Sequence, residues 1–212
     1  MASTFPAVQI KVWGDWACFT RPDAKVERVS FACATPSAAR GVLESVLWKP
    51  HLRWMVRSID VLKPIRYMAV RRNEVTEKAS LRGRPYLIAT DVRAQRNSLI
   101  LRDVAYVISA DIEALPGSHE NEAAYRDQFR RRVERGQCFR MPYLGCREFS
   151  ASFGPADPGD RPIDEDGELG RMLFDLRYEH GSSGRGTPVF FEARLSKGRL
   201  VVPRELYQED AA

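Results

Sequence analysis

The chain has 212 residues and a hydrophobic fraction of 44%, which is enough for the core of one large domain or of a domain with a small appendage. Its 10% aromatic content argues against intrinsic disorder, and its net charge of +5 suits a polyanionic partner, although many proteins with such a charge bind none. No apolar run reaches the roughly 18 residues of a spanning helix, and the N-terminus lacks a signal-peptide pattern. We therefore expect a cytoplasmic protein without a membrane partner.

The first predicted elements are a strand and a helix. Alternating apolar residues predict a strand over 8–12, and Thr35 followed by Pro36 is a typical helix start, with the threonine as N-cap. Apolar residues at helical spacing continue to position 47, and Pro50 ends the helix. Gly41 lies inside this helix, where glycine costs about 1 kcal/mol relative to alanine. Close packing, or the close approach of a ligand backbone, would explain it.

The middle of the chain contains two predicted strands separated by an insertion. Residues 52–61 alternate and then change phase, which predicts a long strand with a bulge. Residues 65–100 are polar and poorly periodic, apart from a short candidate strand at 86–89, and such a long stretch without clear elements is often functional. Residues 104–112 show the clearest alternation in the chain and predict a strand.

A second helix is expected from a cap at Ser118 or Asn121 to about Arg135, with Gly136 as its C-terminal stop. Its apolar stripe consists of Tyr125, Phe129 and Val133. A strand-like segment follows over 138–149.

The order β-α-β, insertion, β-α-β predicts an α+β fold with a ferredoxin-like (RRM-like) domain over 1–154 and an insertion at about 65–100. Residues 155–167 are rich in Pro, Gly and Asp and are typical of a linker. Beyond them, alternating apolar residues predict a small C-terminal antiparallel β-sheet domain within 155–212.

The four cysteines lack the two-residue spacing of a zinc site, and a cytosolic chain of this length does not need disulfides. We expect buried free thiols at Cys18, Cys33, Cys138 and Cys146. No paired-carboxylate motif and no histidine–cysteine cluster indicates a metal site, so the sequence predicts neither a metal nor another cofactor.

A series of motifs occurs in order over about the first 150 residues. They are VWGDWACFTRP at 12–22, KVERVS at 25–30, TPSAARG at 35–41, WKP at 48–50, RRNEV at 71–75, FRRR at 129–132, RGQ at 135–137 and GCREF at 145–149. With these motifs the chain resembles the type I-C member of the CRISPR-associated RAMP superfamily. The resemblance implies a ferredoxin-like domain with a small β-sheet domain, and a metal-independent endoribonuclease that cuts the CRISPR repeat transcript. It also implies that the protein stays on the 5′ handle of the guide RNA and joins the other subunits of the surveillance complex.

Metal-free cleavage needs a base for the 2′-OH, a cation for the developing phosphorane charge and an acid for the leaving 5′ oxygen. The family's best-known active site uses a tyrosine just before the Trp-Lys-Pro segment and a Lys-His pair early in the second helix. This chain has Leu47 in the first position, and Ala124 and Tyr125 in the other two. Tyr125 and His119 are therefore the candidate catalytic residues, and His51 is an alternative. For Tyr125 the apolar stripe favours a packing role over a catalytic one, and the remaining histidine, His180, lies in the C-terminal part.

Arginines next to aromatic residues can grip phosphates and stack on bases. The candidate RNA-binding residues are Arg21, Lys25, Arg28, Lys49, Arg71, Arg72, Arg126, Arg130, Arg131 and Arg135. Two simpler explanations remain open, namely a solvated charged face and a structural pairing of Glu74 with Arg71 or Arg72. The expected partners are CRISPR repeat or guide RNA and the surveillance-complex subunits. A non-catalytic RNA-binding scaffold is the alternative function, and duplex DNA is a further candidate partner because of the arginine-rich second helix.

Overall fold

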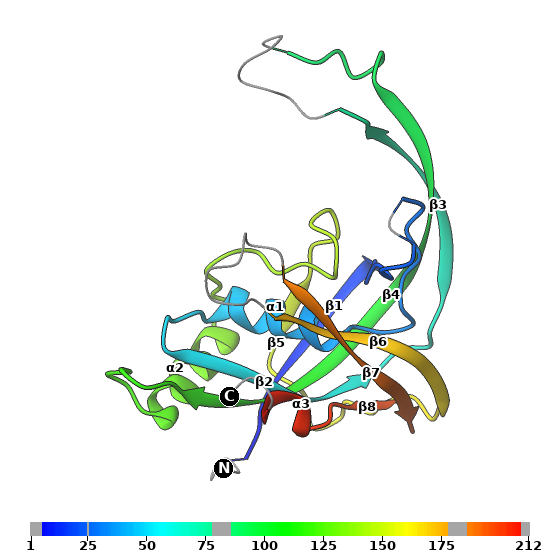
Figure 1. Cartoon of the computed structure of the whole chain (residues 1–212). Helices are drawn as coiled ribbons and strands as arrows, with labels where there is room; N and C mark the ends of the chain where they lie inside the picture. Colours follow the sequence, from blue (N-terminus) through cyan, green and yellow to red (C-terminus); the bar gives the residue numbers. More distant parts are fainter. Residues whose placement is uncertain (1–5, 25, 78–85, 178–185, 209–212) are drawn as a thin grey trace.

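The computed structural model describes residues 6–24, 26–77, 86–177 and 186–208, which form a mixed α/β fold dominated by antiparallel sheet (Figure 1). The elements in chain order are β1 (Val8–Ala17), α1 (Pro36–Val46), β2 (Leu52–Val61), β3 (Tyr67–Val75), β4 (Arg93–Ala114), α2 (Glu122–Glu134), β5 (Ser152–Gly154), β6 (Gly167–Arg177), β7 (Thr187–Ser196), β8 (Arg199–Val201) and α3 (Glu205–Gln208). No helix of the described segments is long and apolar enough to cross a membrane.

The sheet has the strand order β5-β1-β4-β2-β8-β7-β6, with β3 paired to β4 outside this path. The 22-residue strand β4 organises it. Its C-terminal half lies between β1 and β2, whereas its N-terminal half pairs along its length with β3, from Leu101–Tyr67 to Arg93–Val75, and bridges at Leu99 to the chain after β1. The predicted bulge in β2 is confirmed as a register shift between Val56 and Ser58.

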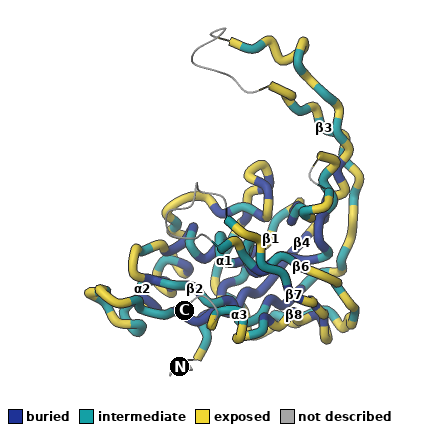
Figure 2. Tube along the Cα trace, viewed as in Figure 1, coloured by how far each residue is buried: buried dark blue, intermediate teal, exposed yellow. Residues whose placement is uncertain are grey.

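The β3–β4 pair forms an arm that projects from the body of the molecule (Figure 1). No residue of β3 is buried, so both faces of this strand meet solvent to some degree (Figure 2). The expectation that 65–100 lacks clear elements was therefore wrong, and so was the short strand at 86–89, where residues 86–88 have no regular structure and a turn follows. The polar insertion is an antiparallel pair of which only the base meets a core: Met68 and Val70 pack against the small buried cluster of Cys18, Ile100, Cys146 and Phe149. Farther out, neither face is buried, so apolar side chains do not mark the alternation there.

Helix α1 begins as predicted. Thr35 Oγ1 accepts a hydrogen bond from the backbone N–H of Ala38 at 3.2 Å, and Pro36 occupies the first turn. The helix packs on β2, and β6 also contacts it, because the C-terminal strands curve back over the body. Its buried positions are Pro36, Ala39, Val42, Leu43, Ser45 and Val46.

Helix α2 is capped by Asn121, whose Oδ1 accepts from the N–H of Ala124 at 2.9 Å, so Asn121 and not Ser118 is the N-cap. The predicted stripe of Tyr125, Phe129 and Val133 is buried against β1, β4 and β5. The ring of Phe129 meets that of Trp54 edge-on at 4.8 Å, which ties α2 to the start of β2.

The segment 138–149, predicted to be strand-like, is an irregular loop, and the short strand β5 follows it instead. Gly145 in this loop has a φ of +84°, and a Cβ there would lie 2.1 Å from the carbonyl oxygen of Cys18. The loop therefore packs backbone-to-backbone on the chain that leaves β1, where Cys18 N–H donates to the carbonyl of Leu144 at 3.0 Å. This contact between segments far apart in sequence prevents an extended strand here.

The C-terminal strands extend the same sheet, because β8 pairs with β2 as well as with β7. Met172, Phe174 and Leu195 share one buried cluster with Ile10 and Leu43 of the N-terminal half. All four cysteines are free thiols; Cys18, Cys33 and Cys146 are buried and Cys138 is half-buried.

Candidate functional site

The histidine-bearing segments meet at the end of the sheet where β2 begins and β4 ends. Leu52 pairs with Ala114, and the N–H of Leu115 donates to the carbonyl of His51 at 2.9 Å. A Cβ placed on Gly117 would lie 3.4 Å from Cε1 of His51, so the 115–121 loop passes over this imidazole. The fold thus brings His51 to the loop that carries His119, although 68 residues separate the two in sequence.

His51 and His119 are exposed, whereas Tyr125 is buried. The Tyr125 hydroxyl lies 2.7 Å from Oγ of Ser118, and that Oγ donates to the carbonyl of Glu120 at 2.7 Å. The single hydroxyl proton of Ser118 is therefore already engaged, so Tyr125 is the donor to Ser118. This hydrogen bond holds the His119 loop against α2.

Leu47 and Ala124, the other two residues compared above with the family's active site, carry no group that can transfer a proton. Leu47 is fully buried in the core, and its carbonyl accepts a hydrogen bond from Trp54 Nε1 at 3.0 Å. Ala124 is half-buried in the first turn of α2. The half-buried Lys49 and exposed Trp48 precede His51 at the same end of the sheet.

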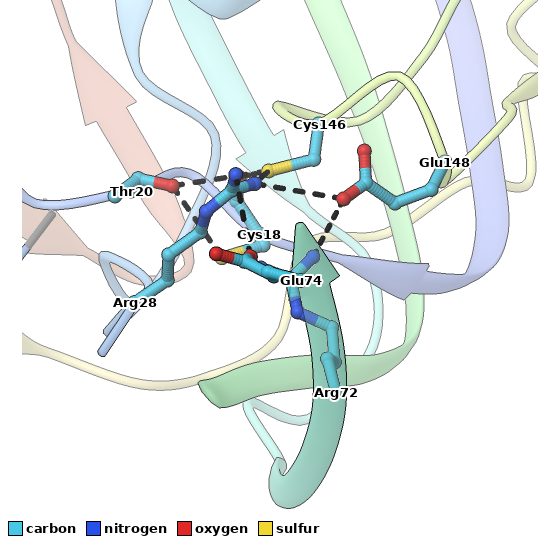
Figure 3. A network of polar contacts seen from close by, with 7 residues as sticks. All are labelled: Cys18, Thr20, Arg28, Arg72, Glu74, Cys146 and Glu148. Atoms are coloured by element: carbon cyan, nitrogen blue, oxygen red, sulfur yellow. Dashed lines mark hydrogen bonds and ion pairs between the residues drawn. The ribbon is translucent and has the colours of Figure 1, made fainter. Parts of the chain in front are cut away.

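A polar network joins three segments beside the base of the arm (Figure 3). Arg28, from the loop after β1, donates through Nη1 to the Sγ of Cys146 at 3.1 Å and forms ion pairs with Glu74 and Glu148 at 3.7 and 3.5 Å. Arg72 of β3 donates to Glu148 at 2.6 Å and to Glu74. The structural pairing of Glu74 that the sequence left open is thus present, with Arg72 as the partner.

The network changes the acidity of its two thiols. The pKa of Cys146 falls from 9.0 to about 6, and the largest cause is a hydrogen bond from Cys18. Burial raises this pKa, whereas the hydrogen bond to Thr20 and the charge of Arg28 lower it further. The hydrogen bond between the two thiols, together with burial, raises the pKa of Cys18. Sequence reasoning missed this site, because each of its residue types is unremarkable alone and Arg28 lies 118 residues from Cys146.

The other arginines divide into internal and exposed groups. Arg126 is buried, and its guanidinium donates to the carbonyl of Pro6. Arg21 is exposed and pairs with Asp23 at 2.9 Å, and Arg130 approaches Asp127 at 4.0 Å. The exposed candidates without an ion pair to another described residue are Arg71, Arg131 and Arg135. Lys25 and His180 lie outside the described residues.

Comparison with known proteins identifies the family. The family described as CRISPR-associated protein (Cas_Cas5) matches residues 7–202. The chain is 44% identical to a protein named CRISPR pre-crRNA endoribonuclease Cas5d from Thermus thermophilus, covering 95% of this chain and 93% of the relative. It is 43% identical to a protein of the same name from Mannheimia succiniciproducens, covering 92% and 94%.

Among solved structures, one titled as a CRISPR-associated protein superposes with a TM-score of 0.70 at 17% identity, covering 94% of this chain and 93% of that chain. The chain belongs to the Cas5 family of CRISPR-associated proteins, and the resemblance seen in the sequence is confirmed. No group of three or more His, Cys, Asp or Glu side chains placed to hold a metal ion occurs in the described part of the chain.

Proposed function

We propose that this protein is a CRISPR pre-crRNA endoribonuclease that cuts the repeat transcript and remains on the 5′ handle within a cytoplasmic surveillance complex. The observation that carries the proposal is 44% identity, over 95% of the chain, to a relative named for this activity. The closeness of His51 to the loop that carries His119, at one end of the sheet, supports it. In this proposal the exposed arginines Arg21, Arg71, Arg130, Arg131 and Arg135, together with Lys49 and Lys25, form the RNA-binding surface, whereas the buried Arg126 serves the fold.

The strand order also supports the proposed ferredoxin-like unit within 1–154. The four strands β5-β1-β4-β2 are mutually antiparallel neighbours, with α1 between β1 and β2 in the chain and α2 between β4 and β5. That arrangement is the one expected of a β-α-β-β-α-β fold. In the same proposal the strands within 155–212 are the small sheet that extends this unit.

The proposed chemistry uses groups already present. A base removes the proton from a 2′-OH, which attacks the adjacent phosphorus, and an acid protonates the departing 5′ oxygen, leaving a 2′,3′-cyclic phosphate and a 5′-OH. The exposed His119 and His51 take the two proton-transfer roles, since histidine is the side chain that most often serves as a general acid or base. Lys49 meets the phosphorane charge. Tyr125 acts as a positioning residue, because its hydroxyl holds the His119 loop through Ser118.

The test is incubation of the purified full chain with its own repeat RNA in EDTA. We expect one defined cut with a 2′,3′-cyclic phosphate end. His119→Ala should slow the cut by roughly 10²–10⁴-fold, whereas Tyr125→Phe should lower both rate and thermal stability. Glu134→Ala, an exposed change at the far end of α2, is the control. RNA that stays intact after long incubation with the wild-type protein would refute the nuclease proposal.

A non-catalytic scaffold is the second candidate, and the specific observation in its favour is the absence of the family's tyrosine, lysine and histidine from the positions of Leu47, Ala124 and Tyr125. Tight binding of repeat RNA without a cut would establish it. A cut that depends on His119 or His51 would remove it.

A further inference from the structure

A groove of about 410 Å³ lies beside α1, and neither candidate catalytic histidine lines it. Helix α1, the chain after β1, the loop before Cys146 and strand β6 border it. Its lining residues are Phe19, Thr20, Thr35, Ser37, Ala38, Gly41, Ser45, Tyr143, Gly145, Leu173 and Leu176. The volume falls within the roughly 300–1,000 Å³ of small-molecule pockets.

Nothing in the described structure explains why position 41, inside α1, is a glycine. Its φ is not in the left-handed range, and a Cβ added there would meet nothing within 4 Å. Neither backbone conformation nor packing therefore requires a glycine, although alanine would be the more stable residue inside a helix. Since Gly41 lines the groove, an occupant that approaches the helix backbone accounts for the missing side chain.

The described lining is uncharged and partly apolar, because none of the described residues that form it is an Asp, Glu, Lys or Arg. Thr35 caps α1 and Ser45 Oγ donates to the carbonyl of Gly41 at 2.6 Å, so these two hydroxyls serve the helix. The half-buried Tyr143 offers a ring, and its hydroxyl makes no hydrogen bond to another described residue. A phosphate would find no counter-charge in such a groove, whereas an uncharged planar heterocycle would find both a ring and a hydrogen-bonding group.

Two arginines neighbour lining residues, one along the chain and one through its backbone N–H. Arg21 follows the lining residue Thr20, and its side chain is 48% exposed. At the other end the N–H groups of Phe139 and Arg140 approach the carbonyl of the lining residue Ser45 at 2.7 and 3.3 Å. Arg140 is exposed and the Phe139 side chain is 74% exposed. Arg21 is paired with Asp23 at 2.9 Å, an exposed pair that a phosphate can displace, so exposed arginines beside an uncharged lining match a nucleotide whose base enters while its phosphates stay in solvent.

We infer that this groove takes one unpaired nucleobase of the bound RNA, with the flanking phosphates near Arg21 and Arg140. The inference rests on the proposed function, which it deepens by locating where a single base is held.

The experiment combines an abasic scan of the repeat RNA with substitutions of Gly41 in the full chain. For the wild type, removal of one particular base should weaken binding at least about fivefold, the factor expected for loss of one base contact, and removal of its neighbours should not. Gly41→Leu fills the groove and should lose affinity by a similar factor, with an unchanged or higher Tm. For the Gly41→Leu protein, removing that base should no longer change the RNA affinity. The Gly41→Ala protein should keep most of the dependence of its affinity on that base.

Each other outcome overturns the inference. If the wild-type protein binds the repeat and no single base matters in the abasic scan, the inference is overturned and the proposed function stands. If the protein does not bind the repeat at all, both are overturned. Unchanged RNA affinity of Gly41→Leu, with impaired assembly into the complex, would show that the groove takes a protein segment. If Gly41→Leu lowers the Tm, Tyr143→Leu replaces it, and the same abasic position must then lose its effect.

Discussion

At the scale of single residues, the surroundings of Cys146 lower the pKa of its thiol. The thiol accepts a hydrogen bond from Arg28, while Glu74 and Glu148 hold that arginine in place (Figure 3). The hydrogen bond from Cys18, and then Thr20 and Arg28, stabilise a thiolate in the folded chain and not in the unfolded one, so the two states differ in proton affinity.

The first prediction is therefore a pH-dependent stability. The folded pKa of Cys146, about 6, lies below the unfolded value of 9.0, so its contribution is fully present above pH 9 and is lost as pH falls through 6. Cys18, whose pKa is raised, stays protonated across this window. Urea unfolding under reducing conditions should show the wild type losing stability from pH 9 to 6 relative to Cys146→Ser. Parallel pH profiles of the two proteins would contradict the pairing.

At the scale of elements, the arm is held by a small buried cluster at its base and by charge beyond it. Arg72 stands directly opposite Arg96 across the β3–β4 pair, and like charges in that position are unfavourable. Glu74 and Glu148 offset this repulsion, and Glu148 also links the arm to the irregular loop that follows α2.

We expect Glu148→Gln to loosen the arm. Glu148 is 48% exposed, so the loss should be at the scale of exposed pairs, about 0.5–1 kcal/mol. Hydrogen exchange of β3 amides should accelerate a few-fold near Arg72 and stay unchanged in β2. Glu168→Gln, which removes an exposed ion pair to Arg194, is the matched control and should leave β3 exchange as in the wild type.

Helix α2 is a candidate nucleic-acid-binding element, since Arg131 and Arg135 are exposed at its C-terminal end. If they contact phosphates, changing both to alanine should weaken nucleic-acid binding for all sequences. The slope of log K against log salt should become shallower by about 0.7 per lost contact on single strands and about 0.9 on duplex DNA. Arg194→Ala on β7 is the control, and equal slopes for both variants would remove α2 from the interface.

At the scale of the whole molecule, the C-terminal strands complete the core. Arg199 of β8 binds Asp60 of β2 through two hydrogen bonds of 2.6 and 2.8 Å, and Asp60 is buried. The hydroxyl of Tyr207 accepts from the N–H of Val56 at 2.8 Å and donates to its carbonyl at 3.2 Å. These contacts and the shared apolar cluster couple the two parts of the chain.

We therefore expect a single cooperative unfolding transition. All four tryptophans lie between residues 13 and 54, so their fluorescence reports on the N-terminal part, whereas far-UV circular dichroism reports on the whole chain. The two signals should change at the same urea concentration. An earlier circular-dichroism transition would show instead that 155–212 unfolds as an independent domain.

The amino-acid sequence by itself determined the elements whose signals are local. The Thr35–Pro36 start of α1, the stripe of α2 and the alternation of 104–112 are all readable, because capping and periodicity involve residues a few positions apart. The ordered family motifs gave the family in the same way.

Only the tertiary structure decided the arm, the irregular 138–149 loop, the joining of β8 to β2, and which arginines are internal. In each case the deciding partner is distant in the chain: 76 residues separate Arg72 from Glu148, and 139 separate Asp60 from Arg199. Local spacing carries no information about such a partner, because pairing, burial and charge compensation are set by what the folded chain brings alongside.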